Sequence, residues 1–253
     1  MAAGNTTTSA SPHLIADLAT ANHILYDQGV LDAFGHISAR HDKEPGRFLL
    51  ARNMAPALVT ADDIVEFRLD GVPLTAAGRP VYLERFLHGA IYRARPDVMA
   101  IVHSHSPSVV PFSAAMDSPL RAICHMAGFL GTATPIFEIR DFAGDASDLL
   151  ISSNGLGASL AQVLGDQPVV LMRGHGSTVV ADSVVTAVFR AVYTEVNARI
   201  QSDALRLGPV NFLTEGEGKS TARTNEGQGM RAWNLWKKAA EIRCAALAEL
   251  SAG

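Results

Sequence analysis

Hydrophobic residues in the first half of the chain follow helical spacing, then strand spacing, then helical spacing again. Between His13 and Gln28 they recur every three to four positions, which predicts a helix that Pro12 opens and Gly29 stops. Alternating apolar and polar residues then predict a meander of strands, with a further helix after it. The predicted strands are residues 34–40, 47–50 and 64–69, and the predicted helix is residues 82–94. Strands joined by such short turns pair as antiparallel neighbours.

The second half of the chain mixes buried strands with helices. Two apolar runs, at 100–103 and 169–172, are typical of buried strands. The other predicted segments are short helices at 108–116 and 156–164, extended segments at 121–125 and 136–139, a long amphipathic helix at 183–207 and a last helix at 230–250. Strands and helices in this order predict an α/β sandwich built on one central sheet.

The remaining stretches suggest how the chain is divided. Residues 1–11 offer little to bury and are predicted to form a disordered tail, with residues 12–253 as a single domain. Residues 208–229 are rich in Gly, Thr, Ser and charge, which predicts a mobile connection or a lid. Trp233 and Trp236 in the last helix are expected to anchor the core or a subunit contact rather than to bind substrate.

Composition narrows the class of protein. The chain has 253 residues, of which 48% are hydrophobic and 18% charged, so it can bury one core of ordinary size. A net charge of -4, without a basic segment, argues against nucleic acid or a membrane surface as a partner. With two cysteines, no signal-peptide pattern and no apolar run long enough to span a bilayer, we expect a cytoplasmic protein with reduced thiols.

Three histidines and one glutamate are candidate metal ligands. His103 and His105 close one apolar run two residues apart, so on a strand both imidazoles would project from the same face. His175 closes the other apolar run between two glycines, and Glu84 lies near the start of a predicted helix. Such a set suits one divalent ion, Zn²⁺ or Mn²⁺ with Fe²⁺ and Co²⁺ as alternatives, and leaves a position for water or substrate. The alternative is that these are core histidines and a solvated glutamate; no organic cofactor is expected.

Four motifs in this order resemble the class II aldolase/adducin family. They are Gly-His-Ile-Ser-Ala-Arg at 35–40, Glu-Arg-Phe-Leu-His at 84–88, His-Ser-His at 103–105 and Arg-Gly-His-Gly at 173–176. The resemblance spans roughly residues 12–205 and implies a three-layer α/β/α sandwich around a central, largely antiparallel mixed sheet. It also implies a homotetramer with active sites at subunit interfaces. By the same resemblance the three histidines are metal ligands, and Glu84 is a ligand or an acid/base.

The chain departs from the sugar-phosphate aldolases of that family where those enzymes hold phosphate. The corresponding positions here carry His36, Asn53, Met54, Tyr82 and Leu83. Because these residues replace small and hydroxyl-bearing groups that would cradle a phosphate, a phosphorylated sugar is not expected. The tyrosine that protonates intermediates in those aldolases is replaced by His125, which we assign to catalysis together with Glu84.

The residues that replace the phosphate site favour an aromatic acid. Arg52 lies where the phosphate loop would be, and its planar guanidinium suits a carboxylate. Tyr82, Leu83 and Phe129 would supply flat apolar walls. The residues that we assign to substrate binding are His36, Ser38, Arg52 and Tyr82. The alternatives are a surface salt bridge for Arg52 and ordinary packing for Tyr82 and Phe129.

Within the family, the chain is similar to metal-dependent decarboxylases of hydroxylated phthalates and pyridine dicarboxylates. We therefore predict a lyase of a catabolic pathway, in which the metal stabilises the oxygen that takes up the electrons and His125 or Glu84 protonates the ring. One alternative is an aldolase or epimerase of an unphosphorylated hydroxy-acid or sugar, because retro-aldol cleavage needs the same electron sink. The other is a non-catalytic scaffold like the adducin head domains, which lack the metal histidines.

Overall fold

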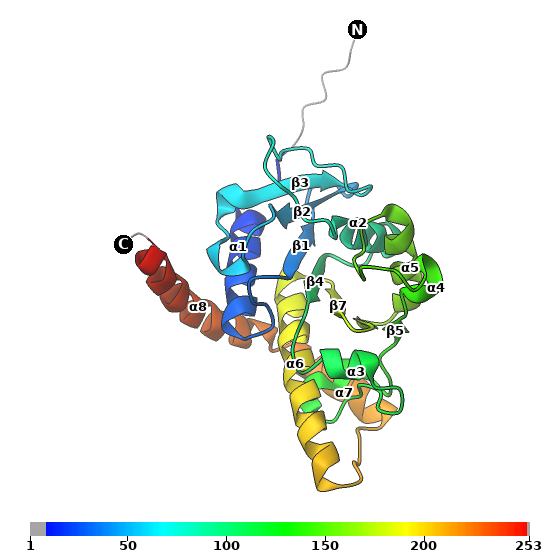
Figure 1. The fold of residues 1–253 in the computed structure, drawn as a ribbon. Coiled ribbons are helices and arrows are strands. Elements are labelled where there is room, and N and C mark those ends of the chain that lie inside the picture. The colour runs from blue at the N-terminus through cyan, green and yellow to red at the C-terminus, as the bar shows by residue number, and fades with distance from the viewer. Residues whose placement is uncertain (1–8, 252–253) are drawn as a thin grey trace.

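A central sheet of seven strands organises the computed structural model, which describes residues 9–251 (Figure 1). The strand order is β3-β2-β1-β4-β7-β6-β5. Neighbouring strands are antiparallel except for β5 and β6, which are parallel. The strands are β1 (His36–Arg40), β2 (Arg47–Ala51), β3 (Ile64–Arg68), β4 (Ala100–Ser104), β5 (Ile136–Phe137), β6 (Val169–Met172) and β7 (Gly176–Ala181). The prediction of a largely antiparallel mixed sheet is confirmed.

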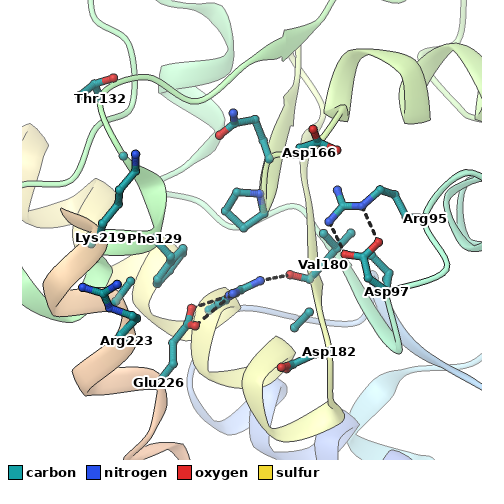
Figure 2. A pocket seen from close by; sticks show the side chains of 18 of the residues that line it. Arg95, Asp97, Phe129, Thr132, Asp166, Val180, Asp182, Lys219, Arg223 and Glu226 are labelled. Atoms are coloured by element: carbon teal, nitrogen blue, oxygen red, sulfur yellow. Dashed lines mark hydrogen bonds and ion pairs between the residues drawn. The ribbon is translucent and has the colours of Figure 1, made fainter. Parts of the chain in front are cut away.

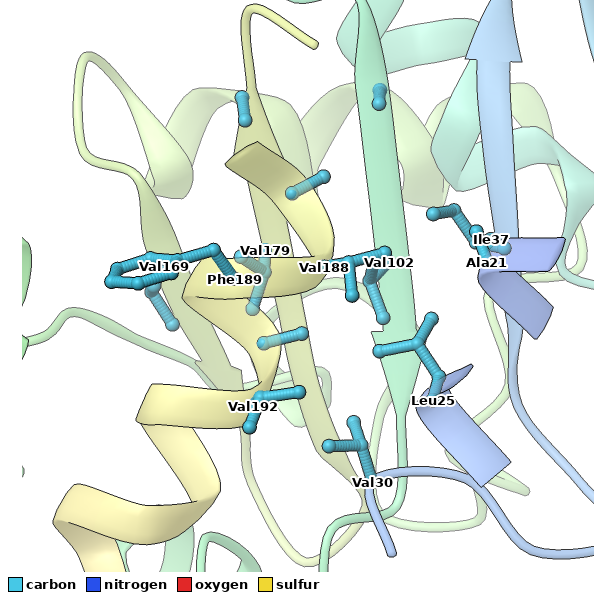
Figure 3. Close-up of a cluster of buried hydrophobic side chains, with 14 of the residues drawn as sticks. Ala21, Leu25, Val30, Ile37, Val102, Val169, Val179, Val188, Phe189 and Val192 are labelled. Carbon is cyan, nitrogen blue, oxygen red and sulfur yellow. The ribbon is translucent and has the colours of Figure 1, made fainter. Parts of the chain in front are cut away.

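Helices cover both faces of this sheet, because side chains along each strand point alternately to the two faces. On β4, Val102 packs into one hydrophobic cluster and Ile101 into the other. Figure 3 shows the first cluster, with Val188 and Val192 of α6 packed over the sheet beside Val102. The helices are α1 (Pro12–Asp27), α6 (Val184–Leu207) and α8 (Gly229–Ser251) on this face, and α2 (Arg85–Ala94) and α5 (Asn154–Leu164) on the other. The three-layer α/β/α sandwich is therefore confirmed.

The start of α1 agrees with the prediction, whereas the start of α2 differs from it. α1 begins at Pro12 as predicted, and the Ser11 hydroxyl caps it by accepting from the backbone N–H of Leu14. α2 begins at Arg85 rather than at residue 82. The Tyr82 hydroxyl donates to a backbone carbonyl of the loop after β2, which holds the two residues before Glu84 outside the helix. Glu84 consequently occupies the N-cap position of α2 instead of its first turn.

The extended segment predicted at 121–125 does not join the sheet. Side chains of α6 hydrogen-bond to its backbone instead of a neighbouring strand. The amide oxygen of Asn197 accepts from the N–H of Ile123 at 3.0 Å, and that of Gln201 accepts from the N–H of Arg121 at 3.0 Å. The segment therefore follows α6 instead of pairing with a strand. The remaining short helices are η1 (Pro56–Leu58), η2 (Ala61–Asp63), α3 (Val110–Ala114), η3 (His125–Leu130) and α4 (Arg140–Ala143).

A helix lies where a mobile connection was predicted. Within residues 208–229, α7 (Glu215–Glu226) begins with a capping box, in which the Thr214 hydroxyl and the Glu217 carboxylate each accept from the other residue's backbone N–H. The helix packs against η3, where Gly218 and Gly128 let the two backbones approach closely. Composition suggested a loop because this helix has few apolar residues and is stabilised by its cap and by close packing.

Alanine substitutions at two glycines test this packing. Gly216 faces open space in α7, so Gly216→Ala is expected to stabilise the fold by about 0.5 kcal/mol through helix propensity. A Cβ at Gly128 would lie 2.5 Å from the carbonyl oxygen of Gly218, so Gly128→Ala is expected to destabilise by about 1–3 kcal/mol. Equilibrium unfolding in urea measures both. Two near-neutral substitutions would show that α7 does not pack on η3.

Other predictions concern the ends of the chain. Of the predicted tail, residues 1–8 lie outside the described residues, whereas Ala10 is buried and the Ser9 carbonyl accepts from the Lys43 ammonium. In α8, Trp233 is buried in the cluster beneath that helix, as expected for a core anchor. Over the described residues no helix is long and apolar enough to cross a membrane. Both cysteines, Cys124 and Cys244, are free.

Candidate metal centre

The three candidate histidines meet at one end of β4 and β7. His103 lies in β4, where the register pairs it with Thr178 of β7. His105 follows the end of β4, and His175 occupies the tight turn between β6 and β7. One ligand atom from each of these histidines and from Glu84 all lie within 4.8 Å of one another. The structure therefore brings together the four residues that the sequence singled out.

Two glycines place His175 against the end of β4. Gly174 has a φ of 66°, in the left-handed region that glycine adopts without strain, and this conformation lets the chain reverse between β6 and β7. A Cβ at Gly176 would stand only 2.0 Å from the backbone oxygen of Ser104, so glycine is required for β7 to approach β4 here. As a result, the ring centroids of His103 and His175 lie 4.9 Å apart.

Glu84 reaches the cluster from the N-terminus of α2. One carboxylate oxygen, Oε1, accepts from the backbone N–H of Ile151 at 3.1 Å, which fixes the side chain. The other oxygen, Oε2, lies 3.2 Å from Nε2 of His103 and 3.6 Å from Nε2 of His175. Only 7% of the residue is exposed. A buried carboxylate held in this way needs a positive partner on its free oxygen.

Hydrogen bonds on the outer side of two rings set which nitrogen faces the cluster. Nδ1 of His103 donates to the carbonyl of Ser177 at 3.1 Å, and Nδ1 of His175 donates to the carbonyl of Leu149 at 3.0 Å. Because a carbonyl only accepts, Nδ1 carries a proton in both rings, and Nε2, the nitrogen that remains for a metal, faces inward. Leu149 has a φ of 67°, which is uncommon for a residue with a side chain, in the segment that presents its carbonyl to His175.

The inward-facing atoms fit a cation better than they fit one another. Nε2 of His105 and Nε2 of His175 are 3.0 Å apart, and Nε2 of His103 is buried without a hydrogen-bond partner among the described atoms. Two ligands of a tetrahedral zinc site with Zn–N distances of about 2.1 Å are separated by about 3.4 Å. The separation between Nε2 of His105 and Nε2 of His175, and those from Oε2 of Glu84 to Nε2 of His103 and of His175, are close to this value. A divalent ion at the centre would therefore find inward-facing nitrogen and oxygen atoms at ligand spacing.

Burial leaves these groups in the protonation states that a metal requires. Desolvation, followed by the nearby His103, lowers the pKa of His175 to about 4, and desolvation also lowers the pKa of His105. Burial alone would raise the pKa of Glu84, but the neighbouring imidazoles, His103 first, outweigh burial and hold this pKa below its ordinary value. At neutral pH, His105 and His175 accordingly present neutral nitrogens beside the Glu84 carboxylate.

Three of the predicted substrate-binding residues follow one another outward from the cluster. His36 pairs with His103 across β1 and β4, with ring centroids 5.2 Å apart, and the Tyr82 ring lies 4.5 Å from that of His36. Arg52 follows Tyr82 in this outward order. Burial raises the pKa of the Tyr82 hydroxyl, and the nearby charge of Arg52 opposes this increase. Nε of Arg52 donates to Asp63 at 2.7 Å, so the salt bridge considered for it is present. The terminal guanidinium nitrogens have no hydrogen-bond partner among the described residues.

The fourth predicted substrate-binding residue, Ser38, lies deeper in the protein. Its hydroxyl oxygen is 2.7 Å from Nδ1 of His88 and 2.8 Å from the hydroxyl of Tyr92, and the side chain is fully buried. Sequence reasoning did not single out His88 or Tyr92 as functional. The sequence signal that could have identified them is their spacing from Glu84. They lie four and eight residues further along the helix, and such positions share one face.

Two other residues named from the sequence lie away from the cluster. Phe129 lines a cavity of about 790 Å³ between η3, α7 and the β6–β7 end of the sheet, and not the wall of the metal centre as predicted (Figure 2). Among the residues that line this cavity, Arg95 pairs with Asp97 and Arg190 pairs with Glu226 (Figure 2). His125 is exposed at the start of η3, and no hydrogen bond or ion pair joins it to the four cluster residues in the described part of the chain.

Comparison with known proteins agrees with this geometry. The model of the class II aldolase and adducin N-terminal domain matches residues 16–202. The decarboxylase tropJ of Talaromyces stipitatus is 38% identical over 242 residues, covering 87% of this chain and 91% of that protein. The 3,4-dihydroxyphthalate decarboxylase of Arthrobacter keyseri is 32% identical over 201 residues, covering 76% of this chain and 78% of that protein.

Solved structures show the same fold at lower identity. The L-fuculose 1-phosphate aldolase of Glaciozyma antarctica PI12 superposes with a TM-score of 0.74 at 22% identity, covering 92% of this chain and 90% of that one. An aldolase II superfamily protein from Pseudomonas syringae gives a TM-score of 0.75 at 22% identity, covering 92% and 95%. From the extent of the family match and from these relatives, the chain belongs to the class II aldolase and adducin N-terminal domain family.

Proposed function

We propose that this protein is a metal-dependent decarboxylase of a hydroxylated aromatic carboxylate, of the phthalate or pyridine type, in a catabolic pathway. The observation that carries the proposal is the cluster of Glu84 with three histidines, whose ligand atoms all lie within 4.8 Å of one another. Relatives that are 38% and 32% identical are named as decarboxylases, one of them for 3,4-dihydroxyphthalate. These relatives support a carboxy-lyase reaction rather than cleavage to an aldehyde.

The residues that would hold the ion are His103, His105 and His175, with Glu84 as a fourth ligand or as the neighbouring base. When bound, a divalent cation supplies a sink for the electrons that remain when the carbon–carbon bond breaks, through the substrate oxygen next to the reacting carbon. Zn²⁺ and Mn²⁺ suit this donor set, with Fe²⁺ and Co²⁺ as alternatives. His105 and His175 are partly exposed, so the approach to the site is from their side.

Glu84 would move the proton that the reaction requires. Decarboxylation replaces a carboxylate on the ring by hydrogen, so one proton must reach the ring carbon for each molecule of CO2 released. Glu84 starts as a carboxylate, can accept the proton of the substrate hydroxyl and can return it to the ring. The second carboxylate of the substrate would lie toward His36 and Arg52, against the Tyr82 ring and the exposed side chain of Leu83.

A pair of product assays tests the proposed reaction. The protein loaded with Zn²⁺ or Mn²⁺ is expected to release CO2 from hydroxyphthalates or hydroxypyridine dicarboxylates without forming an aldehyde. Release of an aldehyde from an unphosphorylated hydroxy-acid or sugar, with no CO2 from the aromatic acids, would instead support the aldolase alternative. Absence of both products and of bound metal would support a scaffold.

Removal of the Arg52 side chain tests the carboxylate site. Arg52→Ala is expected to increase KM for a dicarboxylate by about tenfold, because a charge-assisted hydrogen bond is lost, with little change for the matching monocarboxylate. Arg68→Ala is the control, because Arg68 lies on the neighbouring strand β3 with its side chain largely exposed. Steady-state kinetics on the two substrates gives the comparison. Equal increases in KM for both would mean that Arg52 acts only through its bond to Asp63.

We also propose a homotetramer in which the active site is completed by a neighbouring subunit. His125, which we assigned to proton transfer, is exposed and unconnected to its own cluster, as expected if it serves a neighbour. Large apolar side chains remain on the surface of the single chain, including Met116 at 94% and Leu207 at 90% exposure. Analytical ultracentrifugation measures the assembly, and mixing of His125→Ala with Glu84→Gln subunits tests whether activity returns in hybrids.

A further inference from the structure

A chain of hydrogen bonds runs from the edge of the candidate metal centre into the core. Nδ1 of His36 lies 2.8 Å from Nε2 of His88, and Nδ1 of His88 lies 2.7 Å from the hydroxyl of Ser38. The Ser38 hydroxyl in turn lies 2.8 Å from that of Tyr92. All four side chains are at least 98% buried. Burying four polar side chains costs free energy unless each is satisfied, so the direction of the bonds is constrained.

Only one direction leaves no fully buried proton without an acceptor in this chain. If His36 donated to His88, then His88 would donate to Ser38 and Ser38 to Tyr92, and the Tyr92 proton would have no acceptor among the described residues. In the reverse direction Tyr92 donates to Ser38, Ser38 donates to Nδ1 of His88, and Nε2–H of His88 donates to Nδ1 of His36. Burial raises the pKa of Tyr92, which keeps its hydroxyl protonated and able to start the chain.

The reverse direction determines the state of His36. Its Nδ1 accepts, so a neutral His36 carries its proton on Nε2. That nitrogen makes no hydrogen bond within the described residues, but part of its surface remains in contact with solvent. The His36 ring lies between those of Tyr82 and His103, at centroid distances of 4.5 Å and 5.2 Å. A single N–H donor with contact to solvent therefore lies on the ring next to the candidate ligand His103.

We propose that Tyr92, Ser38 and His88 are positioning residues that hold His36 as an Nε2–H donor, and that this donor binds the carboxylate of the substrate that is not lost. The second part rests on the proposed function. The arrangement favours an anionic acceptor over a donor at this place, because the tautomer with a lone pair on Nε2 would leave the chain behind it unsatisfied. Ser38 thus influences substrate binding without touching the substrate.

The direction of these hydrogen bonds can be tested without any substrate. In zinc-loaded protein labelled with nitrogen-15 at histidine, long-range proton–nitrogen NMR correlations identify the tautomer of each ring, and a His36→Gln sample assigns the His36 signals. We expect the Nε2–H form of His36 in the native protein and a mixture with the Nδ1–H form in Ser38→Ala. Tyr92→Phe should shift the balance less, because Ser38 can still donate to His88. An Nδ1–H tautomer in the native protein, or no change in Ser38→Ala, would refute the proposed direction of the hydrogen bonds.

Kinetics then decides whether this donor meets a carboxylate. Ser38→Ala is expected to increase KM for the dicarboxylate by about tenfold with kcat changed less than about twofold, and to leave KM for the monocarboxylate unchanged. Ser38→Thr retains the hydroxyl and should restore KM. Thr194→Val is the matched control, because it removes a buried hydroxyl on α6 outside the chain of bonds. An unchanged KM together with the expected tautomer shift would refute the carboxylate contact while leaving the proposed reaction intact.

Discussion

Replacement of both His103 and His105 by alanine is expected to abolish metal binding and decarboxylation together. The two residues provide half of the four converging ligands, and two remaining ligands do not hold a divalent ion against water. Without the cation, the electrons of the broken carbon–carbon bond have no sink, so kcat should fall by at least about 10³-fold. Elemental analysis by mass spectrometry and the CO2 assay measure the two losses on the same sample.

A matched variant separates this effect from the loss of any histidine. His13→Ala removes an exposed histidine at the start of α1, with its side chain 86% accessible, and should change neither metal content nor rate. The folded state of the double variant is checked by comparing its thermal unfolding with that of the native protein, both in the metal-free form. CO2 release at the native rate from the double variant would refute the proposed mechanism.

Substitution of Gly176 by alanine is expected to disrupt both the sheet and the metal centre. The added methyl group would stand 2.0 Å from the Ser104 backbone oxygen, and neither strand can move without breaking the β4–β7 ladder. We expect a loss of about 3–5 kcal/mol in the free energy of unfolding. Because His175 directly precedes this glycine, metal affinity should fall as well. Urea denaturation and metal titration measure the two effects.

Gly46 provides the comparison for this substitution. It lies in the turn between β1 and β2 with nothing near the position of a Cβ, so Gly46→Ala should change stability by less than about 0.5 kcal/mol. If Gly176→Ala were tolerated as well as Gly46→Ala, the close approach of β4 and β7 at the metal centre would be wrong.

The residues that could be predicted from the sequence are those whose signal is local. The alternation in β1 to β3, the apolar runs of β4 and β6 and the helical spacing of α1 and α6 each lie within one short window. The ligands His103, His105 and His175 were found because each closes such a run, and the family motifs added Glu84. The overall class of the fold followed from the order of these elements.

What could not be predicted depends on contacts between distant segments. α7 lacks an apolar stripe, and its position is set by the close fit of Gly218 on Gly128. The sequence predicts an extended segment before His125 but not its partners, because the amide side chains of α6 that hold it lie more than 70 residues away in the sequence. Likewise, the place of Ser38 behind His36 depends on α2 lying across β1, which no window of sequence reveals.

One divalent ion, held by Glu84 and the three histidines, is proposed to be required for carbon–carbon cleavage. The decisive measurement is titration of metal-stripped protein with Zn²⁺ or Mn²⁺, with bound ion and CO2 release followed in the same series. We expect activity to be absent at the start and to increase in proportion to bound ion, to a limit at one equivalent per chain. Full activity in protein free of metal, or an ion that binds equally well when the histidines are absent, would contradict it.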